Sequence, residues 1–255
     1  MSIRDWAARI FHPCECYGLF AVARSGAHLL TRALQATHLA GRPLQYFNEE
    51  LAPKYAARYE LDSAHIADYL RGLRAAASTD NGVFGFRMDA WDLDRTVARL
   101  RECGEFGPND SREIDILRNA FPGLRCIQLT REDKLRQAIS KARAMQTNLW
   151  LVGKENEVKG EAKFDVALIE HCLDSSANAV KTFAEFFART GIEPLAITYE
   201  NLCDDYAGTV LRVLDFLRIR LPRGFVVGAP TTTRQADATT DEWMARYRSL
   251  GRRPV

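Results

Sequence analysis

The sequence predicts an α/β fold of three layers, in which helices cover both faces of a parallel β-sheet. Short apolar runs alternate along the 255 residues with segments of helical hydrophobic spacing, as in chains that build such sheets. An arginine stands at the carboxyl end of three of these runs, which is where sheets of this kind bind ligands. The composition, 47% hydrophobic and 27% charged, is that of an ordinary globular protein, and we expect one domain over residues 1–255.

The first predicted unit is a strand, a tight turn and a helix. Residues 19–23 form a short apolar run, and Arg24-Ser25-Gly26-Ala27 then turns sharply. Apolar residues follow with helical spacing at Leu29, Leu30, Ala33 and Leu34. This layout directs backbone N–H groups and a helix N-terminus to one point, where Arg24 and Ser25 add a positive charge and a hydroxyl. The pattern predicts a phosphate site, and a strand–helix turn with a merely exposed arginine is the alternative.

The turn is P-loop-like without being an ordinary P-loop. It has one glycine instead of the pattern G-x-x-x-x-G-K-[ST], and its basic residue precedes that glycine. No lysine follows to reach a terminal phosphate, and no hydroxyl stands where it would bind Mg²⁺. The pattern therefore favours a nucleotide that is handled without a metal ion.

A helix and a second strand are expected next. Residues 63–77 carry apolar side chains on one helical face, at Ile66, Tyr69, Leu70 and Leu73. Residues 83–88 form the next apolar run, and Arg87 lies near its carboxyl end. This strand resembles the first one in ending at a cation.

A strand over residues 124–129 opens a further strand–helix unit. We expect Thr130 to cap the helix, with Asp133 three residues on as in a capping box, and Arg131 to take the first helical position. Ser140 lies nine residues after Arg131, about half a turn out of phase. Spacing alone therefore does not bring these two side chains together, and an ordinary capped amphipathic helix is an equal alternative.

The last part of the chain continues the alternation. A long helix over residues 165–189 ends before Gly191-Ile192-Glu193-Pro194, and its phenylalanines are assigned to the core. A strand over 195–199 and a helix over 206–217 follow. Two segments lack periodicity, 154–163 and 222–235. We expect the first to be a surface loop, with a mobile flap beside the ligand as the alternative, and the second to become ordered when a nucleotide binds.

Four patches of the sequence recur together in one known family. They come in the family's order and extend from residue 17 to residue 248. The patches are Arg24-Ser25-Gly26 with Leu29-Leu30 and residues 36–47; Gly82–Gly85; Gln137–Ser140 with residues 143–147 and Trp150; and Arg234–Asp237 with residues 241–248. In these patches the chain resembles the bacterial trehalose 2-sulfotransferase family.

The resemblance implies a donor, 3′-phosphoadenosine-5′-phosphosulfate (PAPS), and a product, 3′,5′-adenosine bisphosphate (PAP). It implies in-line, metal-free transfer of the sulfuryl group to a hydroxyl of a carbohydrate or glycolipid. The residues that it assigns to the 5′-phosphosulfate are Arg24, Ser25 and the backbone of Gly26, Ala27 and His28. Those that it assigns to the rest of the nucleotide are Arg131 and Ser140 at the 3′-phosphate, and Arg234 and Gln235 closing over it. Arg24 would also stabilise the charge that develops on the leaving phosphate.

The acceptor side departs from the family pattern. A glutamate serves the family as base directly before an aromatic pair, and this chain has Gln45 there, whose amide cannot take a proton at neutral pH. General base catalysis typically contributes about 10²–10⁴-fold, so another group is needed for full activity. The candidates by proximity in sequence are Glu49, Glu50, Asp89 and His28.

Arg87 is the second departure. The family commonly has Lys-x-x-Trp after this strand, whereas this chain has Arg87-Met88-Asp89-Ala90-Trp91. Arg87 can supply a cation near the sulfuryl group, and the alternative is that it simply pairs with Asp89 or Asp92.

Three other functions stay open on the sequence. One is a catalytically impaired relative that binds a nucleotide or glycan and lacks the base, as Gln45 suggests. Another is a sulfotransferase for a non-sugar alcohol. The third is a small-molecule kinase, which the missing Gly-Lys-[Ser/Thr] argues against. Replacing Gln45 by Glu would separate an inert relative, which would gain turnover, from an adapted enzyme.

The composition argues against several partners and compartments. The net charge of +2 gives no reason to expect nucleic acid or an anionic membrane as partner. Without a long apolar run or a signal peptide, the chain is expected to be cytoplasmic, with a short amphipathic helix at residues 1–6. Six scattered cysteines predict no disulfide framework, and Cys14-Glu15-Cys16 lacks metal-site spacing, so we expect no metal. A homodimer is expected from the resemblance alone.

Overall fold

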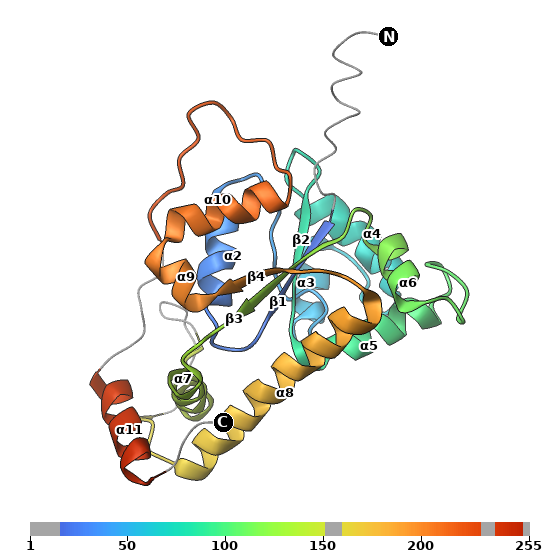
Figure 1. Cartoon of the computed structure of the whole chain (residues 1–255). Helices are drawn as coiled ribbons and strands as arrows, with labels where there is room; N and C mark the ends of the chain where they lie inside the picture. Colours follow the sequence, from blue (N-terminus) through green and yellow to red (C-terminus); the bar gives the residue numbers. More distant parts are fainter. Residues whose placement is uncertain (1–15, 151–159, 231–237, 252–255) are drawn as a thin grey trace, which may run out of the picture.

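Figure 1 shows the computed structural model, which describes residues 16–150, 160–230 and 238–251. The expected N-terminal helix, Cys14 and residues 231–237 lie outside the described residues. The elements in chain order are β1 (Cys16–Ala21), α2 (Ala27–Ala36), α3 (Ala52–Tyr59), α4 (Ile66–Ala77), β2 (Phe84–Met88), α5 (Ala90–Glu102), α6 (Glu113–Ala120), β3 (Arg125–Thr130), α7 (Lys134–Thr147), α8 (Val166–Thr190), β4 (Leu195–Thr198), α9 (Tyr199–Asp204), α10 (Tyr206–Phe216) and α11 (Ala238–Ser249).

The four strands form one parallel sheet in the order β2-β1-β3-β4. All four predicted strands are confirmed, although β1 begins at Cys16 and ends at Ala21 instead of covering residues 19–23. In β1, Gly18 pairs with Phe86 on one side and Cys126 on the other. The central strands β1 and β3 therefore pair on both edges, and β1 is buried along its whole length, which explains its continuous apolar run.

Side chains of β1 alternate between the two faces of the sheet. Tyr17, Leu19 and Ala21 pack with α2, α9 and α10, which lie together on one side of the sheet in Figure 1. Phe20 points to the other face, where its ring contacts Phe183, Phe186 and Phe187 of α8 at centroid distances of 5.6, 5.3 and 5.2 Å. Helices α3–α6 complete that second layer. The predicted arrangement of helices on both faces is thus confirmed, as is the core role of the phenylalanines.

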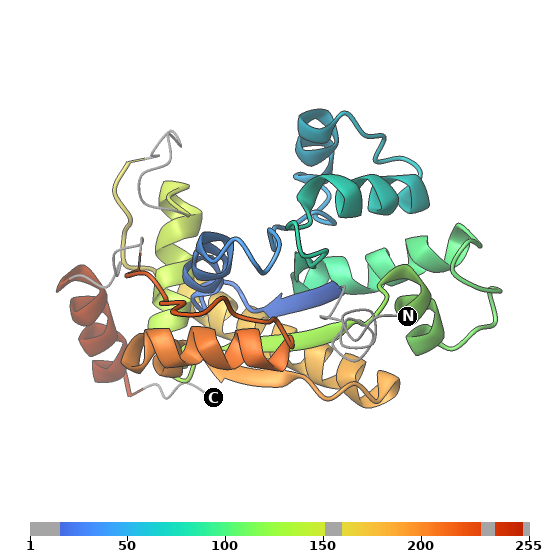
Figure 2. The same ribbon diagram turned by 90° about the horizontal axis from the view of Figure 1, so that it is seen from above.

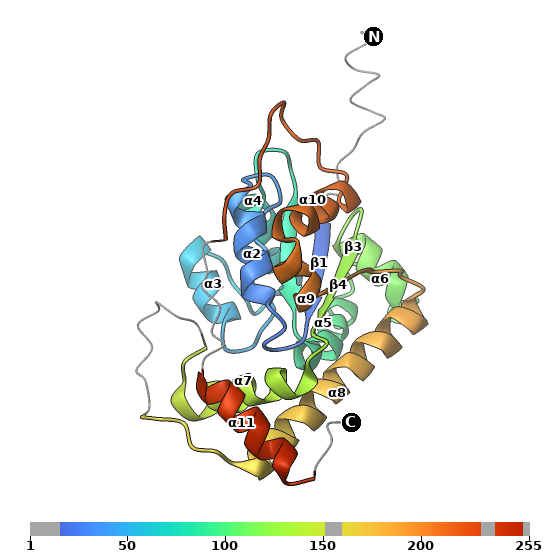
Figure 3. The same ribbon diagram turned by 60° about the vertical axis from the view of Figure 1, so that its left-hand side comes forward.

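The 25-residue helix α8 connects two parts of the core. Its C-terminal half packs under the sheet, while Ile169 and Cys172 in its first half pack with α7 and α11. Figures 2 and 3 show α7 and α11 side by side, away from α3 and α4. Five of the described helices were not predicted from the sequence, namely α3, α5, α6, α9 and α11.

The strand order fixes where a ligand can bind. β1 and β3 are neighbours in the sheet. The connection that leaves β1 leads to β2 on one side of this pair, and the connection that leaves β3 leads to β4 on the other side. The two connections therefore run in opposite directions from the carboxyl ends of β1 and β3. Such a switch point opens a crevice between two loops. The loops that flank it begin with residues 22–26 and 131–133.

Two substitutions of glycine by alanine test the packing beside β2. Gly41 has φ +63°, and a Cβ there would lie 2.8 Å from both the backbone N of Gly85 and the carbonyl oxygen of Val83. Gly41→Ala is expected to cost about 2–5 kcal/mol, combining left-handed strain with overpacking. Gly104, with φ +71° and no atom near its missing Cβ, is the matched control and should cost only about 1–2 kcal/mol as alanine. Urea unfolding measures both, and equal losses would contradict the close approach.

Candidate functional site

The turn after β1 brings a buried hydroxyl to the start of α2. Ser25 is fully buried, and Gly26 is the N-cap of α2 with φ +87°. A Cβ on Gly26 would lie 2.6 Å from the ring of Tyr199, so glycine is required both by conformation and by space. The first N–H groups of α2, from Ala27 and His28 onward, have no acceptor within the helix. This end of α2 therefore offers donors to an anion.

Arg24 adopts the left-handed conformation, with φ +63°. This is uncommon for a residue with a side chain and is found where the surroundings fix it. Its Nε donates to Ser140 Oγ at 2.9 Å, and its Nη1 donates to the carbonyl of Trp150 at 2.7 Å. Ser140 therefore lies beside Arg24, whereas the resemblance paired it with Arg131.

Arg131 leaves the end of β3 before the helix begins. The expectation that Thr130 caps this helix and that Arg131 is its first residue is wrong, because α7 starts at Lys134. The cap is Asp133, whose carboxylate accepts the N–H of Arg136 at 2.9 Å. Freed from the helix, the side chain of Arg131 turns toward β1, and its Nη1 donates to the carbonyl of Arg24 at 3.3 Å.

Two residues after β4 complete this group. The guanidinium of Arg131 lies over the ring of Tyr199 at 4.4 Å, and its Nε is 4.0 Å from a carboxylate oxygen of Glu200. Glu200 also accepts the backbone N–H groups of Glu132, at 2.9 Å, and Asp133, at 3.3 Å. Neither residue was predicted from the sequence to belong to the site. The signal was available, since they follow the fourth parallel strand directly and so lie at the same edge as the other strand ends.

Burial and like charge shape the electrostatics of this group. Burial, and next the charge of Arg131, lower the pKa of Arg24 to about 10. Burial also lowers the pKa of Arg131, against the opposing influence of Tyr199 and Glu200. Both guanidiniums still carry their protons at neutral pH, so two positive charges are held together in a poorly hydrated place. An anion between them would relieve that repulsion.

Three buried donors near the strand ends have no hydrogen-bond partner. They are Ser25 Oγ, Arg87 Nε and Arg131 Nε, and they make up most of the buried unpaired side-chain atoms in the described part of the chain. Leaving a buried donor unsatisfied typically costs about 1–3 kcal/mol, more for a charged group, so natural structures keep few of them. Their concentration at residues predicted from sequence to bind an anion fits a phosphorylated or sulfated ligand.

A second group of polar residues lies at the end of β2. The segment before α3 runs beside this strand, since Leu44 bridges to Phe86 and the N–H of Arg87 donates to the Leu44 carbonyl at 2.8 Å. This brings Gln45 Nε2 into a hydrogen bond with Asp89 Oδ2. Arg87 Nη2 is 3.7 Å from the same oxygen, so the predicted alternative of an Arg87–Asp89 pair is confirmed.

The structure thus gathers most of the predicted site residues into two neighbouring groups. The donor group is defined here as Arg24, Ser25, the start of α2, Arg131 and Ser140; the acceptor group is Gln45, Arg87 and Asp89. Arg234, Gln235 and most of segment 154–163 lie outside the described residues, so their predicted roles stay predictions. His28 is half-buried in the first turn of α2, with its ring 3.5 Å from Arg32 Nε.

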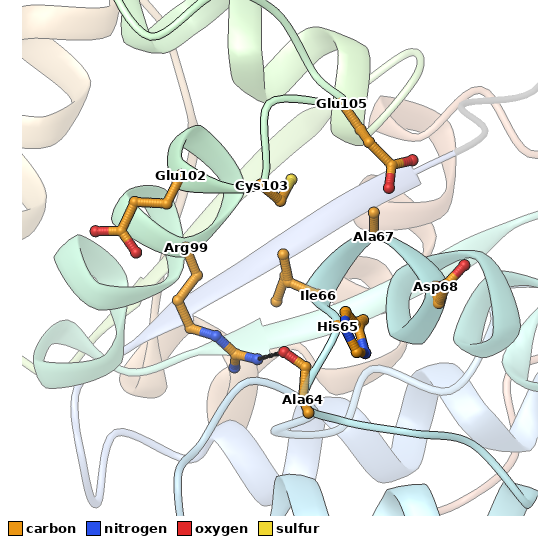
Figure 4. A pocket seen from close by; sticks show the side chains of 9 residues that line it. All are labelled: Ala64, His65, Ile66, Ala67, Asp68, Arg99, Glu102, Cys103 and Glu105. Atoms are coloured by element: carbon orange, nitrogen blue, oxygen red, sulfur yellow. Dashed lines mark hydrogen bonds between the residues drawn. The ribbon is translucent and has the colours of Figure 1, made fainter.

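A cavity lies away from these groups. Figure 4 shows this space of about 350 Å³ between the start of α4 and the end of α5, with His65 and Glu102 among its lining residues. Because α5 begins beside the carboxyl end of β2 and runs away from it, this cavity is separate from the strand-end site. In the described ranges there is no cluster of metal-binding side chains. None of the described helices combines the length and apolar character that crossing a bilayer requires.

The chain is similar to known proteins over nearly its whole length. The family model described as Stf0 sulphotransferase matches residues 16–250. A trehalose 2-sulfotransferase of Mycobacterium tuberculosis is 27% identical over 259 residues, covering 91% of this chain and 94% of the relative. A trehalose 2-sulfotransferase of Mycolicibacterium smegmatis is 27% identical over 269 residues, covering 93% and 95%. Among solved structures, the sulfotransferase domain from the curacin biosynthetic pathway aligns with a TM-score of 0.40 and 18% identity, over 82% of this chain and 75% of that one.

The carboxylate of Glu200 provides a test of the turn that positions Arg131. Glu200→Ala removes the acceptor of two backbone N–H groups and is expected to lower the free energy of unfolding by about 1–2 kcal/mol. Glu200→Gln keeps one acceptor oxygen and should lose roughly half as much. Exposed Glu193 is the control, and Glu193→Ala should change the urea midpoint little. A Glu200→Ala midpoint equal to that of wild type would contradict this role.

Proposed function

The chain belongs to the Stf0 sulphotransferase family, and from this premise we propose that it transfers a sulfuryl group from PAPS to a hydroxyl of a carbohydrate or glycolipid. The names of its two curated relatives support a sugar acceptor. The single observation that carries the assignment of the donor is that Ser25 Oγ and Arg131 Nε, both buried and without a hydrogen-bond partner, lie on the loops that flank the switch point. PAPS carries an anionic group at each of two positions, which suits two cationic loop ends.

In this proposal each residue of the donor group has a task. Arg24, Ser25 and the first N–H groups of α2 hold the 5′-phosphosulfate, and Arg131 with Ser140 binds the 3′-phosphate. Because the transfer moves negative charge onto the leaving phosphate, Arg24 stabilises the transition state more than the ground state. One such donor is typically worth about 2.7–4 kcal/mol of barrier. Arg234 and Gln235 close over the nucleotide from the C-terminal side.

The acceptor group receives the hydroxyl in this proposal. Arg87 ends β2 next to β1, so its free Nε lies at the same edge of the sheet as the donor group. Gln45 faces the acceptor at the boundary between the buried Asp89 and solvent. A second candidate function, a relative that binds the nucleotide without turnover, is favoured by the same Gln45, since an amide is no base.

A ligand titration tests the donor. PAP at 100 times its dissociation constant is expected to stabilise the protein by about 2.7 kcal/mol, which a thermal-shift assay detects. ADP, which lacks the 3′-phosphate, should stabilise less at equal concentration. Stabilisation by magnesium-ATP without any by PAP would contradict the proposal and favour a kinase.

Substitution of one arginine tests the 3′-phosphate assignment. Arg131→Ala removes a charge-assisted contact and is expected to weaken PAP binding by roughly 10- to 100-fold in calorimetry. Arg131→Lys keeps the positive charge but loses the bidentate guanidinium, so its PAP affinity should lie between that of wild type and that of Arg131→Ala. Gln45→Ala is the control from the acceptor group, and its PAP affinity should match that of wild type. An Arg131→Ala protein that binds PAP as well as wild type rules out this role for Arg131.

A further inference from the structure

The carboxylate of Asp89 is turned away from its expected local partner. Asp89 is the N-cap of α5, where aspartate usually accepts a hydrogen bond from the second or third helical N–H. Here it makes no such capping bond. Oδ2 instead accepts a hydrogen bond from Gln45 Nε2 and lies 3.7 Å from Arg87 Nη2. Asp89 therefore makes contacts within the acceptor group in place of a capping hydrogen bond to α5.

Burial sets this carboxylate apart from the neighbouring acids. Asp89 is only 3% exposed, and in the described part of the chain its Oδ1 accepts no hydrogen bond. Gln45, which donates the hydrogen bond to it, is half-buried. A buried carboxylate with one oxygen committed and one available is the arrangement that a proton acceptor needs.

The structure separates the four candidate bases named from the sequence. Glu49 is strongly exposed and pairs with Arg95, and Glu50 is exposed. His28 belongs to the donor group at the start of α2 and lies near Arg32. Asp89 accepts a hydrogen bond from Gln45, the position at which the resemblance places the family's glutamate.

We propose that Asp89 is the general base for the acceptor hydroxyl and replaces the carboxylate that Gln45 lacks. This inference rests on the proposed function. Asp89 takes the proton of the acceptor hydroxyl as the hydroxyl oxygen bonds to sulfur, while the bond between sulfur and the 5′-phosphate oxygen of PAPS breaks. The electron pair of that bond stays on the phosphate of PAP, and the proton later leaves to solvent. Gln45 fixes the carboxylate through its amide, and the guanidinium of Arg87 faces the developing charge.

Two charged groups face Asp89. Arg87 on β2 faces it with a positive charge, and Asp92 on α5 faces it with a negative one. Burial, and to a smaller extent the charge of Asp89, raises the pKa of Asp92. One opposite and one like charge therefore lie beside the proposed base.

The test measures PAP release from PAPS, with trehalose and with water alone as acceptor. Asp89→Asn is expected to lower kcat by about 10²–10⁴-fold, while the thermal shift by PAP stays at the wild-type value. In the Asp89→Asn background, Gln45→Glu restores a carboxylate one hydrogen bond away and should recover at least tenfold in rate. A merely structural role of Asp89 would not give that recovery.

Asp92→Asn is the matched control. Asp92 is equally buried on the same helix and is bound by Arg95 and Asn48, so its loss should lower stability but leave kcat within a few-fold of wild type. Asp89→Asn turnover equal to that of Asp92→Asn would overturn the proposal. A wild-type protein that binds PAP but does not turn over PAPS would also overturn the proposal, whether or not the Gln45→Glu variant gains turnover. Absence of PAP binding would overturn the proposed function itself.

Discussion

The approach of two arginines at the carboxyl ends of neighbouring strands is the constraint around which this structure is built. Arg24 and Arg131 are joined through a backbone carbonyl at 3.3 Å, and both are too buried for water to screen their charges fully. Several features serve this approach. The left-handed turn at Arg24, the glycine that admits Tyr199 and the carboxylate of Glu200 that caps the next turn all hold cations where repulsion would otherwise separate them. Such an arrangement costs stability, and in general it is found at sites that bind an anion.

The acceptor group shows a different way to hold charge. The carboxylate of Asp89 is buried, but it has a cation and an amide beside it, so the charge is compensated within the protein. In the donor group two arginines lie close together with the carboxylate of Glu200 4.0 Å from one of them, whereas in the acceptor group one arginine faces one carboxylate. This difference suits a reaction in which one substrate arrives as a polyanion and the other as a neutral alcohol.

The sheet and the donor group could largely be predicted from the sequence, because both follow from local patterns. Four apolar runs identified four strands, and the arginines at their ends were placed at one edge by the rule for parallel sheets. The start of α7 was mistaken because Thr130 and Asp133 are both good caps, and only the extension of β3 to Thr130 decides between them. The contact of Gln45 with Asp89 could not be foreseen, since it depends on a segment that joins β2 by a single bridge between residues far apart in the chain.

That single bridge has an evolutionary consequence. The donor loops leave the two central strands, whose neighbours on both sides fix their position, while the acceptor segment rests on the edge strand through Leu44 and the buried rings of Tyr46 and Phe47. Substitutions, insertions or a new loop can enter at that edge without disturbing the ladder of the sheet. Under the proposed function, a lineage built in this way can exchange one alcohol for another while it keeps the same nucleotide. Gln45 and Arg87, which depart from the family pattern, stand at the positions where such divergence would first be expected.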